Sequence, residues 1–247
     1  MGRAFRCNLH VHTCLSPCGD LDMHPSAVVD EAVSQGVDVI AICDHNSSEN
    51  VPYVLKAARG KPIVVIPGME VTTREEVHVI ALFEDTASLS ALQEYVYANL
   101  SGLNDEKAFG LQPIVNEIGE VEGFNERLLI GATGISLEDL VSRIHEQSGL
   151  AIAAHIDRPS FSVISQLGFL PEHVPFDALE ISSRLGIRGG REKFPELAHN
   201  TFITSSDAHF IKDIGTRFTA IFMEEARFSE IRLALKGRDG RFVVEDA

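Results

Sequence analysis

Six of the ten histidines in this sequence are expected at the edges of β-strands, each near an aspartate or glutamate. His10 and His12 form an H-x-H pair in extended chain, which puts both imidazoles on one face because side chains alternate along a strand. The remaining members of the pattern are Asp44-His45, Glu70, His78, His155, and Asp207 with His209. Each motif alone has an ordinary structural explanation, but together they indicate a metal site. Imidazole and carboxylate suit Zn, Mn or Fe, whereas a calcium cage would be all oxygen.

The elements that must position these side chains follow one another as strand-then-helix units. Residues 37–43 form a nearly continuous apolar run rich in β-branched residues, typical of a strand buried on both faces of a parallel sheet. Further strands are predicted at 3–10, 63–66, 77–83, 150–154, 177–181, 201–204 and 218–222, and helices at 25–35, 47–59, 89–100, 137–147 and 229–236. Seven or eight parallel-type strands with crossover helices favour a barrel, whose strand ends all open onto one face.

One segment, residues 101–135, interrupts this rhythm. It is polar and contains glycines, and residues 112–124 have the pattern of a hairpin. We interpret it as a lid-like insertion. Because no repeat, low-complexity tract or linker separates the remaining units, a single domain over 1–247 is expected.

Composition restricts the class of protein and its partners. The net charge of -15 makes a general nucleic-acid surface unlikely, because duplex binding requires Lys and Arg to neutralise phosphates. The sequence has neither a membrane-length apolar stretch nor the apolar core of a signal peptide, so a cytoplasmic protein without membrane contact is expected. The cysteines are predicted to be reduced; Cys14 and Cys18 are the pair that could add a soft metal ligand or a redox function.

These motifs, in this order, resemble the PHP (polymerase and histidinol phosphatase) family of metal-dependent phosphoesterases. The resemblance spans nearly the whole chain and rests on His10-Val11-His12, Cys43-Asp44-His45-Asn46, Gly68-Met69-Glu70, His78, His155 and Ser206-Asp207-Ala208-His209. It implies a distorted (β/α)7 barrel with three divalent transition metal ions.

The resemblance also implies how the ligands are shared among the metals. The first metal would take His10, His12, Glu70 and Asp207; the second would share Glu70 with His78 and His155; the third would take His45, His209 and an early acid or histidine. The segment after His12 is about three residues longer than in the family. Its early ligand is therefore open: alignment on Pro25 favours Asp20, with Asp22 and His24 as alternatives.

A mechanism follows from such a centre. Two cations about 3.5–4 Å apart can hold a hydroxide between them and clamp the attacking and leaving oxygens. Glu70 would bridge the pair, Asp207 could receive a proton, and His209 or His45 could act near the leaving group. Arg158 and Arg184 are candidates for binding the phosphate of the substrate, because the planar guanidinium matches phosphate bidentately. Arg188 and Arg191 are expected in loops of the same region.

The predicted function is hydrolysis of a small phosphorylated metabolite or nucleotide. The alternatives are a nuclease acting on nucleic-acid ends, a metal-binding domain without catalysis, and hydrolysis of carbon–nitrogen bonds. That last chemistry would typically need a carboxylated lysine between the metals, and the corresponding residue is Glu70.

Overall fold

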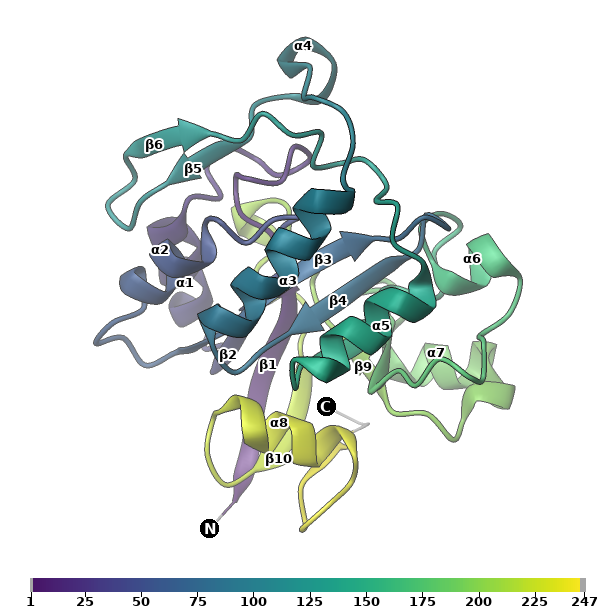
Figure 1. Cartoon of the computed structure of the whole chain (residues 1–247). Helices are drawn as coiled ribbons and strands as arrows, with labels where there is room; N and C mark the ends of the chain where they lie inside the picture. Colours follow the sequence, from purple (N-terminus) through teal and green to yellow (C-terminus); the bar gives the residue numbers. More distant parts are fainter. Residues whose placement is uncertain (1, 245–247) are drawn as a thin grey trace.

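The computed structural model describes residues 2–244, and a nine-stranded sheet forms its centre (Figure 1). The strand order is β11-β10-β1-β2-β3-β4-β7-β8-β9. In chain order these strands are β1 (Arg3–Val11), β2 (Val39–Ile42), β3 (Val64–Thr72), β4 (His78–Leu82), β7 (Leu150–Ala153), β8 (Ala178–Ile181), β9 (Phe202–Thr204), β10 (Thr219–Met223) and β11 (Phe242–Val244). Central strands such as β2 and β7 are fully buried, as their apolar sequences predict.

The sheet curls until the segment after β9 meets β1. Val11 forms a parallel bridge with Ala208. One step earlier, the Asn8 amide donates to Ser206 Oγ at 2.7 Å, and the Ser206 backbone N–H donates to Asn8 Oδ1 at 3.0 Å. These contacts give a nearly closed barrel, which confirms the predicted α/β barrel-like fold.

The strands were expected to be of the parallel type, but several of them pair antiparallel. β4 pairs antiparallel with both β3 and β7, and β10 pairs antiparallel with β1. β3 also runs beyond the predicted 63–66, because its second half, Gly68–Thr72, pairs with β4. Gly68 makes this close approach possible: a Cβ there would lie 2.9 Å from the Ile42 carbonyl oxygen. Glu70 therefore lies inside a strand, and the prediction of a strand that ends at residue 66, before Glu70, was wrong.

The predicted helices are present, but two of them start more than one residue from the predicted position. The helices are α1 (Pro25–Ser34), α2 (Val51–Ala57), α3 (Thr86–Asn99), α5 (Leu137–Glu146) and α8 (Phe228–Leu235). Of these, α2 starts four residues later than predicted and α3 three residues earlier. A helix was predicted from residue 47, but the hydroxyls of Ser47 and Ser48 bond to Tyr97 and Gln93 on α3. The serines join two segments instead of starting a helix, and α2 begins at Val51.

Outside the interrupted segment, two α-helices were not predicted, α6 (Val163–Leu167) and α7 (Gly186–Lys193). Glycine is a weak helix former, so the run Gly-Ile-Arg-Gly-Gly at the start of α7 did not indicate a helix. The structure explains one of these glycines, because a Cβ on Gly190 would lie 2.5 Å from Ile181 on β8. Tight packing on the sheet outweighs the low helix propensity here.

The interrupted segment forms α4 (Glu106–Phe109) and a separate hairpin of β5 (Pro113–Val115) and β6 (Val121–Phe124). These elements lie beyond the carboxyl end of β1 (Figure 1). Asn46 fastens the segment to the barrel, since its amide donates to the carbonyl oxygens of Leu129 and Gly131, both at 2.8 Å. The hairpin lies within the predicted residues 112–124, and it lies at the end of the barrel where β1 ends (Figure 1).

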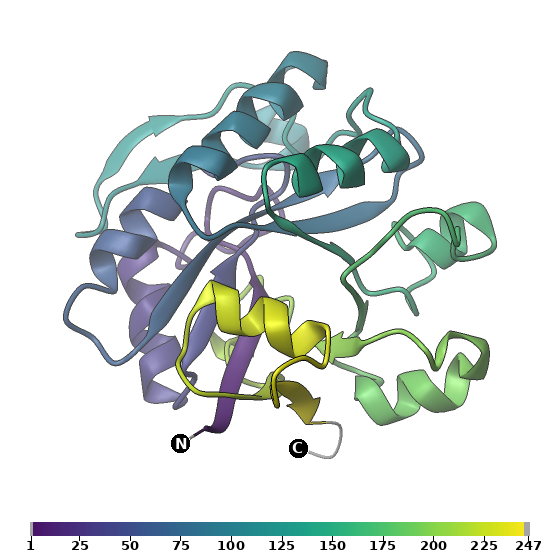
Figure 2. The same ribbon diagram turned by 60° about the horizontal axis from the view of Figure 1, so that its bottom comes forward.

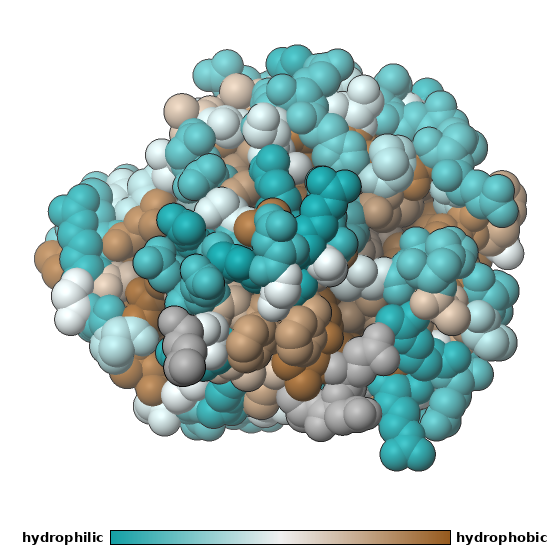
Figure 3. Space-filling view, turned by 90° about the horizontal axis from the view of Figure 1, so that it is seen from below, coloured by the Kyte–Doolittle hydropathy of each residue, from teal (hydrophilic) through white to brown (hydrophobic). Residues whose placement is uncertain are grey.

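The opposite end of the barrel is covered by α8, close to both ends of the chain (Figure 2). Seen from below, hydrophilic side chains gather across the middle of this face and hydrophobic ones toward its lower edge (Figure 3). Within residues 2–244, no helix has the length and apolar character needed to cross a membrane.

Candidate metal centre

Histidines and acids from distant parts of the chain converge at the carboxyl end of β1. His10 and His12, at the end of β1, hold their Nε2 atoms 3.1 Å apart. Asp207, which follows β9, places Oδ1 3.3 Å from His10 Nε2 and 3.2 Å from His12 Nε2. The three side chains are at most 5% exposed.

Glu70 lies at the centre of the cluster. Its Oε2 is 3.2 Å from His45 Nδ1 and 3.4 Å from His10 Nε2. Its Oε1 is 3.0 Å from His78 Nδ1 and 3.3 Å from His155 Nε2. One carboxylate therefore spans two groups of imidazoles, which is the position of a bridging ligand.

The unsatisfied atoms in this cluster show that it fits metal ions. Buried polar atoms normally have hydrogen-bond partners. Here His45 Nδ1, Glu70 Oε1, His78 Nδ1 and Asp207 Oδ1 are buried without one. Three sets of ligand atoms lie close enough to share an ion: His12, His45 and His209; His10, His12 and Glu70; His45, Glu70 and His78. Nitrogen and carboxylate donors of this kind suit Zn, Mn or Fe.

Strained backbone accompanies three residues of this region. Asn46, His155 and Asp207 have φ values of 50°, 29° and 51°, in the left-handed region that non-glycine residues rarely adopt. Such a conformation costs about 1–3 kcal/mol per residue and persists only where the surroundings enforce it. At His155 and Asp207 the unusual turn directs a side chain into the cluster immediately after a strand ends.

The electrostatics of the metal-free protein keep both acids ionised. Burial opposes ionisation of Glu70, but His78, His10 and His45 outweigh it and lower its pKa well below the usual value. Burial likewise opposes ionisation of Asp207, yet His10 and His12 lower its pKa. The ligand set therefore presents carboxylates at neutral pH.

The two histidines of the H-x-H pair titrate in opposite directions. Burial disfavours the imidazolium of His10, but Glu180, Asp207 and Glu70 raise its pKa well above the usual value. Burial and the neighbouring His209 lower the pKa of His12 to about 3. Two imidazolium ions could not coexist at this separation, so one ring stays neutral.

Glu180, on β8, contacts His10 through the ring nitrogen that faces away from the other cluster residues. It was not predicted from the sequence. Its Oε2 lies 3.0 Å from His10 Nδ1 and accepts the His155 backbone N–H at 3.1 Å. A carboxylate on the far nitrogen of a ligating histidine fixes the ring and raises its basicity. The available signal was an acid inside the otherwise apolar strand Ala178–Ile181.

Replacing this residue gives a first prediction. Glu180→Gln is expected to weaken metal binding about 10–100-fold, the usual effect of losing such a partner. Titration of the chelator-treated variant with Zn²⁺ or Mn²⁺ measures it. Glu172→Gln, at an exposed position, serves as the control. Equal affinity of the two variants would contradict the role of Glu180.

The three candidates for the early ligand lie in different surroundings. The Asp20 backbone N–H donates to the His209 carbonyl oxygen at 2.8 Å, so Asp20 lies beside the cluster, but its Oδ1 accepts the Asp22 N–H. Asp22 is exposed, and His24 uses its Nδ1 to cap α1. Within the described residues, the three sets of ligand atoms include none of these side chains.

The predicted arginines fall into two groups. Arg158 contacts the cluster directly, with Nη2 2.5 Å from Asp207 Oδ2. Arg158 and Arg184 line a common cavity of about 570 Å³ together with Ser182 and Lys193.

Arg188 and Arg191 lie on α7, so the expectation that they occupy loops was wrong. The exposed Arg188 pairs with Glu192 on the same helix. Arg191 donates to the Ala198 carbonyl oxygen and lies over the Phe202 ring. Both guanidinium groups therefore make contacts within the α7 region and the segment that follows it.

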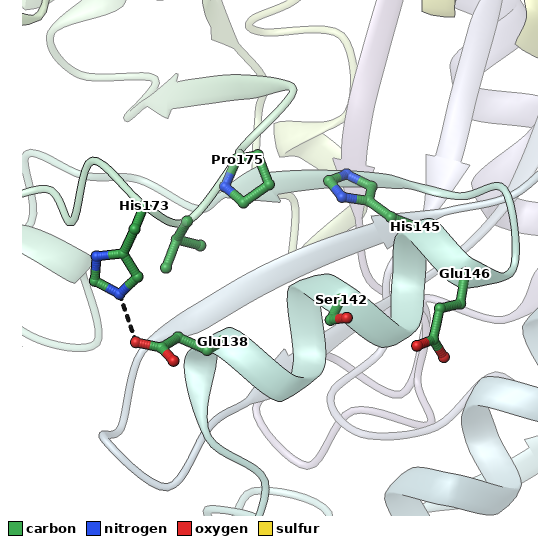
Figure 4. Close-up of a pocket in the computed structure, with 7 residues that line it drawn as sticks. Glu138, Ser142, His145, Glu146, His173 and Pro175 are labelled. Carbon is green, nitrogen blue, oxygen red and sulfur yellow. Dashed lines mark hydrogen bonds and ion pairs between the residues drawn. The ribbon is translucent and has the colours of Figure 1, made fainter.

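The cysteines and the other histidines lie outside the ligand sets. All four cysteines are free thiols, with Cys14 buried and Cys18 exposed. His145 and His173 line a separate cavity of about 380 Å³ beside α5, where His173 pairs with Glu138 at 2.5 Å (Figure 4).

The barrel and the cluster together define a class: α/β-barrel proteins with histidine and carboxylate ligands at the carboxyl ends of the strands. The PHP domain model matches residues 8–165, more than half of the sequence. The chain therefore belongs to the PHP domain family, and the resemblance seen in the sequence is confirmed.

Individual relatives are more distant. The uncharacterised protein YqxK of Bacillus subtilis is 31% identical over 117 residues, which cover 45% of this chain and 29% of that protein. The lesion-specific endonuclease PfuEndoQ of Pyrococcus furiosus has a TM-score of 0.70 at 18% identity, covering 98% of this chain and 58% of the other. A Bifidobacterium adolescentis protein described as a metal-dependent phosphoesterase has a TM-score of 0.57 at 18% identity, covering 85% and 89%. This chain matches less than a third of the length of each curated relative.

Proposed function

We propose that this chain is a metal-dependent phosphoesterase that hydrolyses a small phosphorylated metabolite or nucleotide. One observation carries the proposal: histidine and carboxylate side chains from six strands or strand ends meet around Glu70, and several of their buried atoms have no hydrogen bond. Burying such polar atoms without a partner costs free energy. Divalent cations would coordinate several of them at once.

In this proposal the centre holds three divalent ions, and every one of them is Zn, Mn or Fe. Glu70 would bridge two of them, with His10, His12 and Asp207 on one side and His78 and His155 on the other. His45 and His209 would hold the third ion, and Asp20 is the candidate to complete it. Divalent ions bound there would lower the pKa of a water and offset charge on the phosphoryl oxygens.

The side chains around the centre supply the rest of the chemistry. Asp207 lies next to the cluster, and its carboxylate is the candidate to accept a proton from the attacking water. His209, with its side chain 21% exposed, is the candidate to donate a proton to the leaving group. Arg158 reaches the cluster from the cavity that it shares with Arg184, and both guanidinium groups can bind phosphate oxygens.

Metal analysis and a substrate panel test this function. Purified protein is expected to carry close to three equivalents of transition metal and to hydrolyse p-nitrophenyl phosphate or its diester when Mn²⁺ or Zn²⁺ is supplied. Hydrolysis that survives complete metal removal would contradict the proposal.

A nuclease acting on nucleic-acid ends is the second candidate. The fold shared with an endonuclease favours it, and the cavity lined by Arg158, Arg184 and Lys193 offers positive charge beside the cluster. The net charge of -15 favours a small substrate instead. A single-stranded oligonucleotide labelled at the 5′ end, and a second one labelled at the 3′ end, distinguish the two candidates, because stepwise shortening or release of a labelled mononucleotide would identify a nuclease.

A further inference from the structure

The loop from His155 to Phe161 carries three different groups at the mouth of the cluster. His155 faces Glu70, and Arg158 reaches Asp207. The third group is the ring of Phe161, which stacks on the ring of His78 with centroids 4.7 Å apart and an interplanar angle of 20°. A candidate metal ligand is thus covered by an aromatic ring on its outer side.

The position of Phe161 is enforced by the backbone. Its φ of 56° is unusual for a bulky residue, and its carbonyl oxygen accepts the His78 backbone N–H at 2.9 Å. Phe161 nevertheless remains 40% exposed. One face of the ring contacts His78 while the side chain stays open to solvent, so the strained turn presents an aromatic surface next to the cluster.

We propose that the exposed face of Phe161 binds the planar base of a nucleotide substrate whose phosphate lies at Arg158 and the metal centre. This inference rests on the proposed function and narrows its substrate class. Aromatic rings stack with centroids about 4.5–7 Å apart, and nucleobases stack on aromatic side chains whatever their sequence. Arg158, three residues before Phe161, supplies the charge that a phosphate requires. A sugar phosphate without a planar ring would use Arg158 but gain nothing from Phe161.

Two ligands that differ only in the base test this inference. Binding of adenosine 5′-monophosphate and of ribose 5-phosphate is measured by calorimetry with Mn²⁺ present, alongside kcat/KM for hydrolysis of each. In Phe161→Leu, affinity for the nucleotide should fall about tenfold, the scale of one base–aromatic stack. Affinity for ribose 5-phosphate should stay within about twofold, and Phe161→Tyr should retain nucleotide binding, because its ring still stacks.

Three controls separate stacking from disturbance of the cluster. The metal content of Phe161→Leu must match that of the unchanged protein, since Phe161 contacts His78. Phe169→Leu alters a Phe that is 61% exposed and lines a different cavity, so it should change neither affinity. Phe210→Leu tests the other exposed ring beside a candidate ligand, His209.

The outcomes are distinct. Equal losses for both ligands in Phe161→Leu, an unchanged preference for the nucleotide, or a loss seen in Phe210→Leu instead would overturn the role of Phe161. If the unchanged protein hydrolyses neither p-nitrophenyl phosphate nor its diester with Mn²⁺ or Zn²⁺ supplied, the proposed function fails, while the binding comparison still decides whether Phe161 recognises a base.

Discussion

Glu70→Gln is expected to reduce hydrolysis of phosphate esters by more than about 10³-fold, a loss typical of residues that act as one catalytic unit. Glutamine has nearly the same size but no negative charge, and its amide cannot serve as a bridging carboxylate. In the unchanged protein, Glu70 oxygens lie within 3.5 Å of five imidazoles, so one substitution affects every part of the cluster. The metal content should fall together with turnover.

Steady-state kinetics with saturating Mn²⁺, elemental analysis and circular dichroism together measure this effect. Glu84→Gln is the matched control, because Glu84 is exposed just past the end of β4 remote from His78. The control should keep full activity. A Glu70→Gln protein that remains folded and active would show that this carboxylate does not hold a catalytic centre.

Much of the barrel could be predicted because its strands are buried on both faces. The run at 37–43 indicated β2, and the alternation of such runs with helical segments indicated a barrel. Strand direction was not predictable, because an apolar run reads the same in either orientation. The extension of β3 to Thr72 depends on pairing with β4, a contact that local sequence does not encode.

The candidate site was predictable where ligands sit at strand ends, as with His10, His155 and Asp207. The rule that such ends meet on one face locates them without knowledge of the loops. Glu180 escaped the prediction because its role is to hold another side chain, His10. Asp20 stays open for a related reason: its position depends on a backbone bond to His209, and the path of a longer loop cannot be derived from spacing.

Removal of the metals is expected to lower thermal stability as well as activity. Ions that bind only the folded chain stabilise it by about 4 kcal/mol when present at 1,000 times their Kd. For a chain of this size, each kcal/mol changes Tm by about 2–4 °C, so chelation should lower Tm by roughly 8–16 °C. The structural reason is the set of buried atoms that have no hydrogen bond, including His45 Nδ1 and Asp207 Oδ1, because a bound ion would coordinate them.

Differential scanning calorimetry of the metal-loaded and chelator-treated protein measures the shift, and added Mn²⁺ or Zn²⁺ should restore it. Ca²⁺ should restore little, because it prefers oxygen ligands and most of the donors here are imidazoles. Glu70→Gln provides the internal comparison: with the bridging carboxylate gone, chelation should shift its Tm much less. If chelation shifted the Tm of the unchanged protein and of Glu70→Gln equally, the stabilising ions would lie elsewhere in the chain. Metal-dependent stability would then not depend on the Glu70 cluster.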